Sequence, residues 1–174
     1  MSSKLTTYIG FLRGVNVGGR TMLPMSELRT LCEKLGFERV RTYIQSGNLI
    51  LESLLSAGAL TKQLETALQQ KMGKRIPVAI RTIDELENVL TKNPFQNAEP
   101  ARVGVMFFAK PVQKDFLDRV STSTGEEVKI GKREVYIYYP NGMGRSKLKL
   151  PKQADEGTVR NINTVRKLIE LCRA

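Results

Sequence analysis

The chain has no histidine and no tryptophan. A Ser-His-Asp site, a Cys-His site and a histidine-ligated zinc are therefore excluded. The two cysteines, Cys32 and Cys172, form no CxxC motif and are too few for a four-cysteine metal site. Each lies in an apolar stretch with helical spacing, where a free cysteine behaves as a small hydrophobic residue. We therefore expect no metal, no cofactor and no thiol catalysis.

Long hydrophobic runs are also absent. A membrane-spanning helix needs about 18 or more apolar residues, and the run at 103–109 is far shorter and is interrupted by Gly104. Residues 1–7 contain no continuous hydrophobic segment of the signal-peptide kind. These features predict a cytoplasmic protein without a membrane partner.

Acidic residues are scarce: 17 Asp and Glu face 28 Lys and Arg, which gives a net charge of +11. Such a surface attracts anions. With 174 residues, 41% of them hydrophobic, the chain can bury a core in one domain or two small ones. Disordered and collagen-like structures are excluded.

Apolar patterns in the first half predict a regular series of elements. A nearly continuous apolar run indicates a buried strand, whereas steps of three and four indicate a helix. The predicted elements are a strand at 7–13, a helix from Pro24 to Leu35, a hairpin of 40–45 with 48–51, a helix at 60–72 and a strand at 77–81. This βαββαβ order is that of a split-βαβ, ferredoxin-like unit.

The pattern restarts after a short helix at 84–90 and a connector. The predicted elements are a strand at 103–109, a helix at 112–120, a hairpin of 126–130 with 134–139, and a last helix capped at 157–158. The fold class is therefore α+β: two tandem ferredoxin-like repeats of βαββα type with antiparallel sheets, the second lacking its final strand. The predicted domains are 1–92 and 102–174, joined by 93–101. Either the second sheet has three strands, or it takes the 77–81 strand.

Five motifs carry a resemblance. They are FLRGVNVGG at 11–19, TYIQSGN at 42–48, NPF at 93–95, SKL at 146–148 and TVRNINTV at 158–165. Together they resemble the signatures of the domain-of-unknown-function family 1697. The resemblance implies a cytoplasmic α+β protein with two ferredoxin-like repeats, and it implies no reaction. The family's last motif has an aromatic residue where this chain has Ile162, so a stacking side chain is missing there.

The loop after the first strand is the first candidate site. Arg13, Asn16, Gly18 and Gly19 could expose backbone N–H groups and guanidinium to a phosphate or carboxylate. The glycine spacing is neither GxGxxG nor GxxxxGK[ST]. The alternative is a flexible connection with a hydrated arginine at each end.

The predicted hairpin tip is the second candidate. Gln45, Ser46 and Asn48 offer donors and acceptors for an amide or a nucleobase edge. Alternatively, these residues serve the turn alone.

The third candidate lies in the second half, where 129–152 holds seven basic residues and one acidic residue. We expect Arg145 and Lys147 to join Thr158, Arg160 and Asn161, at the start of the last helix, in one anion site. The alternative is that each charge is separately hydrated.

The leading hypothesis is a binding protein for an anionic, phosphorylated ligand, either a nucleotide or an RNA backbone. A second hypothesis is a small-molecule enzyme with a polar pocket between the repeats, in which Asn16, Gln45, Asn48 and Arg160 orient the substrate. Its acid–base groups would be Glu, Asp, Lys or Tyr. The third is a protein-interaction module that uses a free sheet edge. The sequence leaves open whether the protein is an enzyme.

Overall fold

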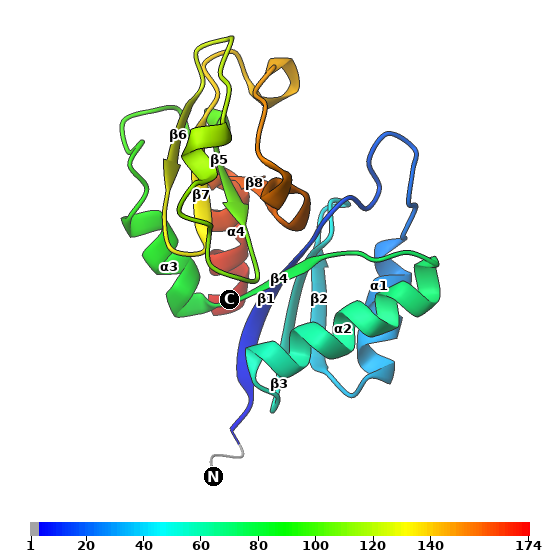
Figure 1. Cartoon of the computed structure of the whole chain (residues 1–174). Helices are drawn as coiled ribbons and strands as arrows, with labels where there is room; N and C mark the ends of the chain where they lie inside the picture. The colour runs from blue at the N-terminus through cyan, green and yellow to red at the C-terminus, as the bar shows by residue number, and fades with distance from the viewer. Residues whose placement is uncertain (1–3) are drawn as a thin grey trace. The chain divides into compact units, whose positions relative to one another are not determined.

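The computed structural model describes residues 4–174 (Figure 1). Packing divides the chain into two compact units. The first unit comprises the described residues up to Glu85 together with Leu171–Ala174, and the second is Leu86–Glu170. Each unit has a four-stranded antiparallel sheet, and the described residues form four α-helices. The fold class is therefore α+β, as predicted.

None of the helices in residues 4–174 has the length and hydropathy needed to cross a membrane.

The first sheet has the strand order β2-β3-β1-β4. In its central register, Ile9 pairs with Ile50 on one side and with Arg81 on the other. The 77–81 strand of the prediction therefore belongs to the first sheet. The elements are β1 (Thr6–Leu12), α1 (Met25–Lys34), β2 (Glu38–Tyr43), β3 (Asn48–Ser53), α2 (Ala57–Met72) and β4 (Val78–Thr82).

The core of the first unit forms where α1 and α2 pack against its sheet. Leu60, Leu64 and Leu68 of α2 recur at steps of four and are fully buried, which is the pattern of an amphipathic helix. Ser56 caps the start of α2, and Gly73 ends it in the left-handed conformation that glycine adopts most easily. Cys32 is buried in this core, and burial raises the pKa of its thiol to about 12, so it packs as a hydrophobic side chain.

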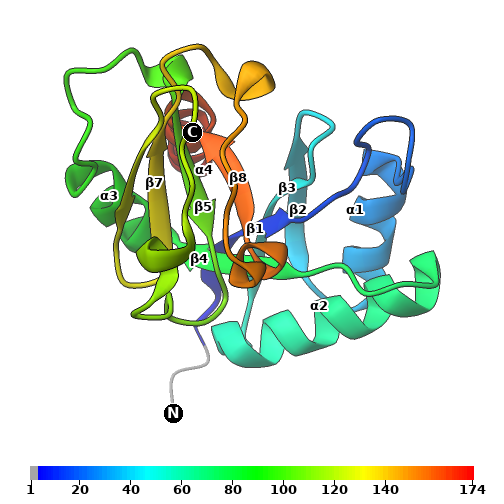
Figure 2. The ribbon, with the colours of Figure 1, turned by 45° about the horizontal axis from the view of Figure 1, so that its top comes forward.

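The second sheet has the order β6-β7-β5-β8, with β5 between β7 and β8 (Figure 2). Along the chain, helix α3 directly follows β4 and helix α4 directly follows β8. The Tyr136 hydroxyl of β7 donates a hydrogen bond to the Val89 carbonyl of α3 at 2.9 Å, which holds α3 to β7. The elements are α3 (Ile83–Thr91), β5 (Val103–Phe107), β6 (Glu127–Ile130), β7 (Glu134–Tyr138), β8 (Thr158–Asn161) and α4 (Ile162–Arg173).

The prediction that the second unit lacks its final strand is wrong. Residues 158–161 form β8, which pairs antiparallel with β5, and α4 begins only at Ile162. The apolar stripe of α4 continues backward through Val159 without a breaker, so the short strand looked like the first helical turn. A strand of four residues places only two side chains on each face, too few for a period of two to be visible.

The helix predicted at 112–120 is also wrong. The segment contains only a short 3₁₀ helix, η2 (Phe116–Arg119). The Val112 N–H donates to the Lys132 carbonyl at 2.9 Å, so this backbone bonds to the β6–β7 hairpin and not to a helix of its own. Phe116 is buried in the second core, where its ring centroid lies 6.1 Å from that of Phe108. The apolar residues at steps of four therefore reflect packing against this core and not a helix.

Candidate anion-binding segment

The link between β7 and β8 contains four basic residues within eight positions. It passes through the 3₁₀ helices η3 (Met143–Arg145) and η4 (Lys152–Glu156). We call Arg145–Lys152 the basic segment. Within it Arg145, Lys147 and Lys149 are exposed, whereas Ser146, Leu148 and Leu150 are half-buried.

Hydrogen bonds keep the basic segment extended. Lys149 and Ser121 exchange two backbone hydrogen bonds of 2.9 Å, as paired strand residues do. Leu148 and Leu150 pack against the core of the second unit. Because alternate side chains of an extended chain point to opposite sides, burial of the two leucines turns Lys147 and Lys149 to solvent.

A buried carboxylate anchors the start of the segment. Glu126 is 6% exposed, and the hydroxyls of Thr124 and Ser146 donate hydrogen bonds to its carboxylate. These hydrogen bonds, that of Thr124 first, lower the pKa of Glu126. Burial and the nearby Glu126 charge raise the pKa of Tyr139 to about 12. The carboxylate therefore holds Ser146 inward while its neighbours Arg145 and Lys147 stay outside.

The cations of the basic segment have no counter-charge in the described structure. Arg145, Lys147, Lys149 and Lys152 form no ion pair within residues 4–174. The sequence from 135 to 154 contains no Asp or Glu. Two residues of extended chain advance about 6.6 Å, so Lys147 and Lys149 lie about that far apart on one side. Arg145, at the end of η3, and Lys152, at the start of η4, continue the row of cations along the chain. Such a row suits successive phosphates of a chain.

The anion site predicted around Thr158 and Arg160 stays a prediction, but these residues do not stand at the start of the last helix. Thr158 and Arg160 lie in β8, and both are buried. The Arg160 Nη1 donates to Thr158 Oγ1 at 2.7 Å and to the Val159 carbonyl at 2.9 Å. Burial lowers the pKa of Arg160 to about 10. The expectation that Arg160 stands in the first helical turn is wrong, because that turn begins two residues later.

Asn161 has a structural task. Its Oδ1 accepts the Thr164 N–H at 2.9 Å, which satisfies one of the unpaired donors at the start of α4. A ligand-binding role for Asn161 stays a prediction.

In the first unit, the glycine-rich loop folds into a small hairpin of its own. Arg20 N–H donates to the Val17 carbonyl at 3.0 Å, and Asn16 N–H to the Thr21 carbonyl at 3.0 Å. Gly18 and Gly19 have φ of 58° and 73°, so both adopt the positive φ that a two-residue turn favours. Arg13, at the end of β1, is half-buried and gives its N–H to the Pro77 carbonyl at 3.0 Å. A phosphate cradle here stays a prediction.

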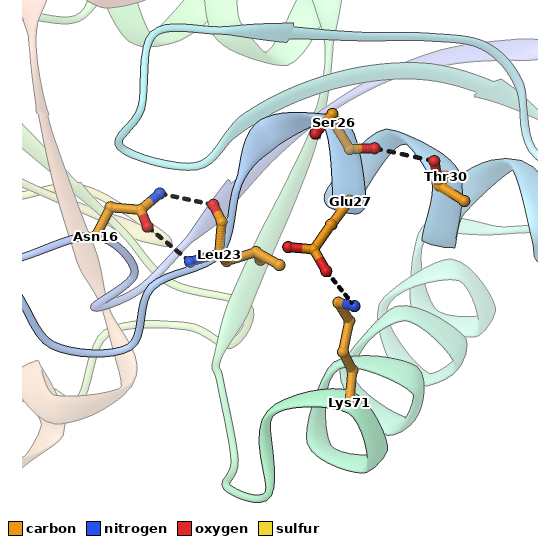
Figure 3. Close-up of polar contacts among 6 residues, drawn as sticks. All are labelled: Asn16, Leu23, Ser26, Glu27, Thr30 and Lys71. Atoms are coloured by element: carbon orange, nitrogen blue, oxygen red, sulfur yellow. Dashed lines mark hydrogen bonds and ion pairs between the residues drawn. The ribbon is translucent and has the colours of Figure 1, made fainter.

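The amide of Asn16 is fully used within the protein. Its Nδ2 donates to the carbonyls of Leu23, at 2.9 Å, and Gln45, at 2.7 Å, and its Oδ1 accepts from Leu23 N–H at 2.7 Å. Figure 3 shows the reciprocal pair with Leu23. Asn16 therefore fixes the loop after β1 to the β2–β3 turn.

The β2–β3 turn also uses its polar side chains internally. Asn48 is buried, and its Nδ2 donates to the Tyr43 carbonyl at 3.0 Å and to Ser46 Oγ at 2.9 Å. Gln45 is exposed and contributes its carbonyl to Asn16. The amide of Asn48 consequently has both donors on protein acceptors, and the role of this turn in ligand binding stays a prediction.

The structure brings Arg145 and Lys147 together on the basic segment and adds residues that the sequence did not single out. Lys149 belongs to the same row, and the alternation Lys147-Leu148-Lys149-Leu150 was the signal for it. Lys152, at the start of η4, adds an exposed cation at the end of the segment. Glu126 gave no signal, since its anchoring role depends on Ser146 reaching it through space. Within residues 4–174 no three His, Cys, Asp or Glu side chains gather to hold a metal ion.

The two four-stranded sheets and the basic segment thus define an α+β protein with a charged link in its second unit. A family model described as "Protein of unknown function (DUF1697)" matches residues 5–136. The chain belongs to this family, as its motifs indicated.

A solved structure has the same fold. It is a conserved bacterial protein, SP0830 from Streptococcus pneumoniae, which is 24% identical in sequence. The match covers 96% of this chain and 98% of that one, with a TM-score of 0.78. No curated protein sequence matches the chain.

Proposed function

We propose that the protein binds an anionic, phosphorylated ligand, and that this ligand is the backbone of single-stranded RNA. The observation that carries the proposal is the row of exposed cations on the basic segment, none of which has an ion-pair partner in residues 4–174. Arg145 and Lys147 are the first contacts, Lys149 extends the row, and Lys152 adds a cation at the start of η4.

The extended backbone supports a chain-like ligand over a single nucleotide. Cations about 6.6 Å apart along a line can each meet a different phosphate, whereas one nucleotide engages only part of the row. Contacts to phosphates carry no sequence information, so binding is expected to tolerate different base sequences. The net charge of +11 favours association with the same polyanion.

The test is fluorescence anisotropy with labelled oligouridylate over a range of salt concentrations. Three or four phosphate contacts to a single strand predict a slope of log K against log salt of about −2 to −3. Lys147→Ala should weaken binding on every base sequence and make the slope shallower by about 0.7. Arg145→Ala should have the same effect.

Lys62→Ala is the matched control, since Lys62 is an exposed lysine of α2 without an ion pair in the described structure. The proposal fails if Lys147→Ala and Lys62→Ala have equal effects, or if affinity does not depend on salt. It also fails if a mononucleotide displaces the RNA at equal phosphate concentration.

We also propose that both units are ferredoxin-like repeats related by duplication. Support comes from the shared strand order, and from one detail of the last strands. Arg81 Nη1 donates to the carbonyl of the preceding Ile80 at 2.9 Å, as Arg160 does to that of Val159. Both arginines are buried one residue before the strand ends. An experimental structure in which the two arginines do not superpose would contradict the duplication.

A further inference from the structure

Two loops of the first unit are held together at one point. The Asn16 amide bonds to Leu23 on its own loop and to Gln45 in the β2–β3 turn, over 2.7–2.9 Å. The segments 13–23 and 43–47 therefore present a common, fixed surface.

Three exposed apolar side chains lie next to the three residues that meet there. Val17 follows Asn16, Met22 precedes Leu23, and Ile44 precedes Gln45. Their exposed fractions are 62%, 63% and 52%. We call these three residues the apolar patch. Among residues 4–174 they are three of the eight large hydrophobic side chains that are exposed. Exposed apolar side chains on two loops that are joined in this way are typical of a contact surface.

The backbone of the apolar patch is strained at Ile44. Ile44 has φ of +52°, a left-handed conformation that is strained for a β-branched side chain. Since Ile44 is exposed, no burial compensates for the strain. Glycine or asparagine would occupy this position more easily. The strain at this exposed isoleucine is the observation from which we infer contact with another molecule.

Charge around the patch indicates the partner. Arg20 is exposed and forms no ion pair within residues 4–174. The sequence contains no Asp or Glu from 4 to 26 or from 39 to 51. A second copy of the chain would bring the same positive charges together. A segment that combines apolar side chains with carboxylates complements both properties of the surface.

We propose that the apolar patch, together with Arg20, docks a short acidic segment of a partner protein that inserts apolar side chains. Because hydrogen bonds already join the two loops, binding does not have to order them. The three apolar side chains make the anchoring contacts. Arg20 selects carboxylates beside them.

The test uses a panel of short fluorescent peptides with the same leucine and phenylalanine core, flanked by glutamate, serine or lysine. Fluorescence polarisation should show saturable binding in the order glutamate, serine, lysine. Arg20→Glu should reverse this order, whereas Lys62→Glu, on α2, should leave it unchanged. The charge exchange identifies Arg20 as the selecting residue.

Ile44→Asn separates docking from folding. Asparagine tolerates the left-handed conformation, so this variant should raise the melting temperature by about 2–4 °C. It should nevertheless lower the affinity for the glutamate-flanked peptide by about tenfold, because an anchoring side chain is lost. Leu54→Asn is the control, because Leu54 is equally exposed outside the patch and should leave the affinity unchanged.

Several outcomes would overturn the proposal. One is the absence of saturable binding to every peptide of the panel. Another is an affinity that Ile44→Asn does not change. A third is a concentration-dependent dimer in sedimentation that Val17→Ser dissolves, since the occupant would then be a second copy. Competition for the patch by oligouridylate would likewise assign it to nucleic acid.

Discussion

The two units have sheets with the same strand order but cover them differently. In the first unit, the links β1–β2 and β3–β4 are the helices α1 and α2, of 10 and 16 residues. In the second unit, the corresponding links contain only 3₁₀ helices. The β5–β6 link has η2, of 4 residues, and the β7–β8 link has η3 and η4, of 3 and 5 residues. Both units nevertheless bury a hydrophobic core on their sheets. Strand pairing therefore sets the architecture, and the links are free to vary.

That freedom changes how the side chains of a link are arranged. On a helix, residues two apart face different directions, so the cations of a Lys-x-Lys pattern diverge. On an extended link they share one side. The basic segment lies in the link that corresponds to α2 of the first unit, and its extended part places Lys147 and Lys149 on one side. The candidate site therefore lies where the second unit has no α-helix.

The largest expected effect tests whether the irregular links hold the second core as firmly as helices do. Phe116→Ala should lower the free energy of unfolding by about 3–5 kcal/mol, because the ring of Phe116 is fully buried against Phe108. Leu64→Ala in α2 should cost about 2–5 kcal/mol. Urea denaturation measures both.

Leu117→Ala is the control for Phe116, since Leu117 is the exposed neighbour in η2 and should change stability by less than about 0.5 kcal/mol. If Phe116→Ala has an equally small effect, the second core does not depend on its 3₁₀ link.

The next effect compares the two hairpins. At Gly47 φ is +83°, and a Cβ would lie 2.8 Å from Val15 Cγ2 and 2.9 Å from Leu12 Cβ. Gly47→Ala should therefore cost about 1–3 kcal/mol. At Gly131, in the β6–β7 hairpin, the nearest atom would be 3.4 Å away and φ is not positive, so Gly131→Ala should change stability by less than about 0.5 kcal/mol. Equal thermal shifts for the two variants would contradict this distinction.

A smaller effect tests the feature that the two units share, a helix that starts directly after the last strand. Thr82 Oγ1 accepts Glu85 N–H at 3.2 Å, and Asn161 Oδ1 accepts Thr164 N–H at 2.9 Å. Thr82→Ala and Asn161→Ala should each cost about 1 kcal/mol by chemical denaturation. Asn163→Ala, at an exposed position of α4, is the control, and a loss as large as that of Asn161→Ala would remove the capping role.

The smallest expected effect is a change in how stability depends on acidic pH, and it comes from Glu126 of the second unit. Hydrogen bonds lower the pKa of Glu126 in the folded protein. They therefore stabilise the folded protein at pH values above the usual glutamate pKa of about 4.3. This contribution is lost as the pH falls through the folded pKa. Ser146→Ala should therefore reduce the difference in melting temperature between neutral and acidic pH. An unchanged pH profile would show that Ser146 does not hold the carboxylate.

Much of the fold was predictable because its elements are long or clearly bounded. The leucine spacing of α2 and the stop at Gly73 predicted that helix, and continuous apolar runs predicted β1, β4 and β5. The charge of the basic segment was also visible, as were Arg145 and Lys147. These signals are local, since each depends on residues within a few positions of one another.

Other features were decided only when the chain folded. Arg160 occupies a strand because β8 pairs with β5, a contact between residues far apart in sequence, and the short strand has no pattern of its own. Residues 112–120 have helical spacing, yet their backbone bonds to a distant hairpin. Glu126 became an anchor through Ser146. The sequence by itself thus determined the types of the long elements, the family and the charge. Tertiary pairing decided the type of the short strand β8 and of residues 112–120, and also which side chains were buried and which aligned.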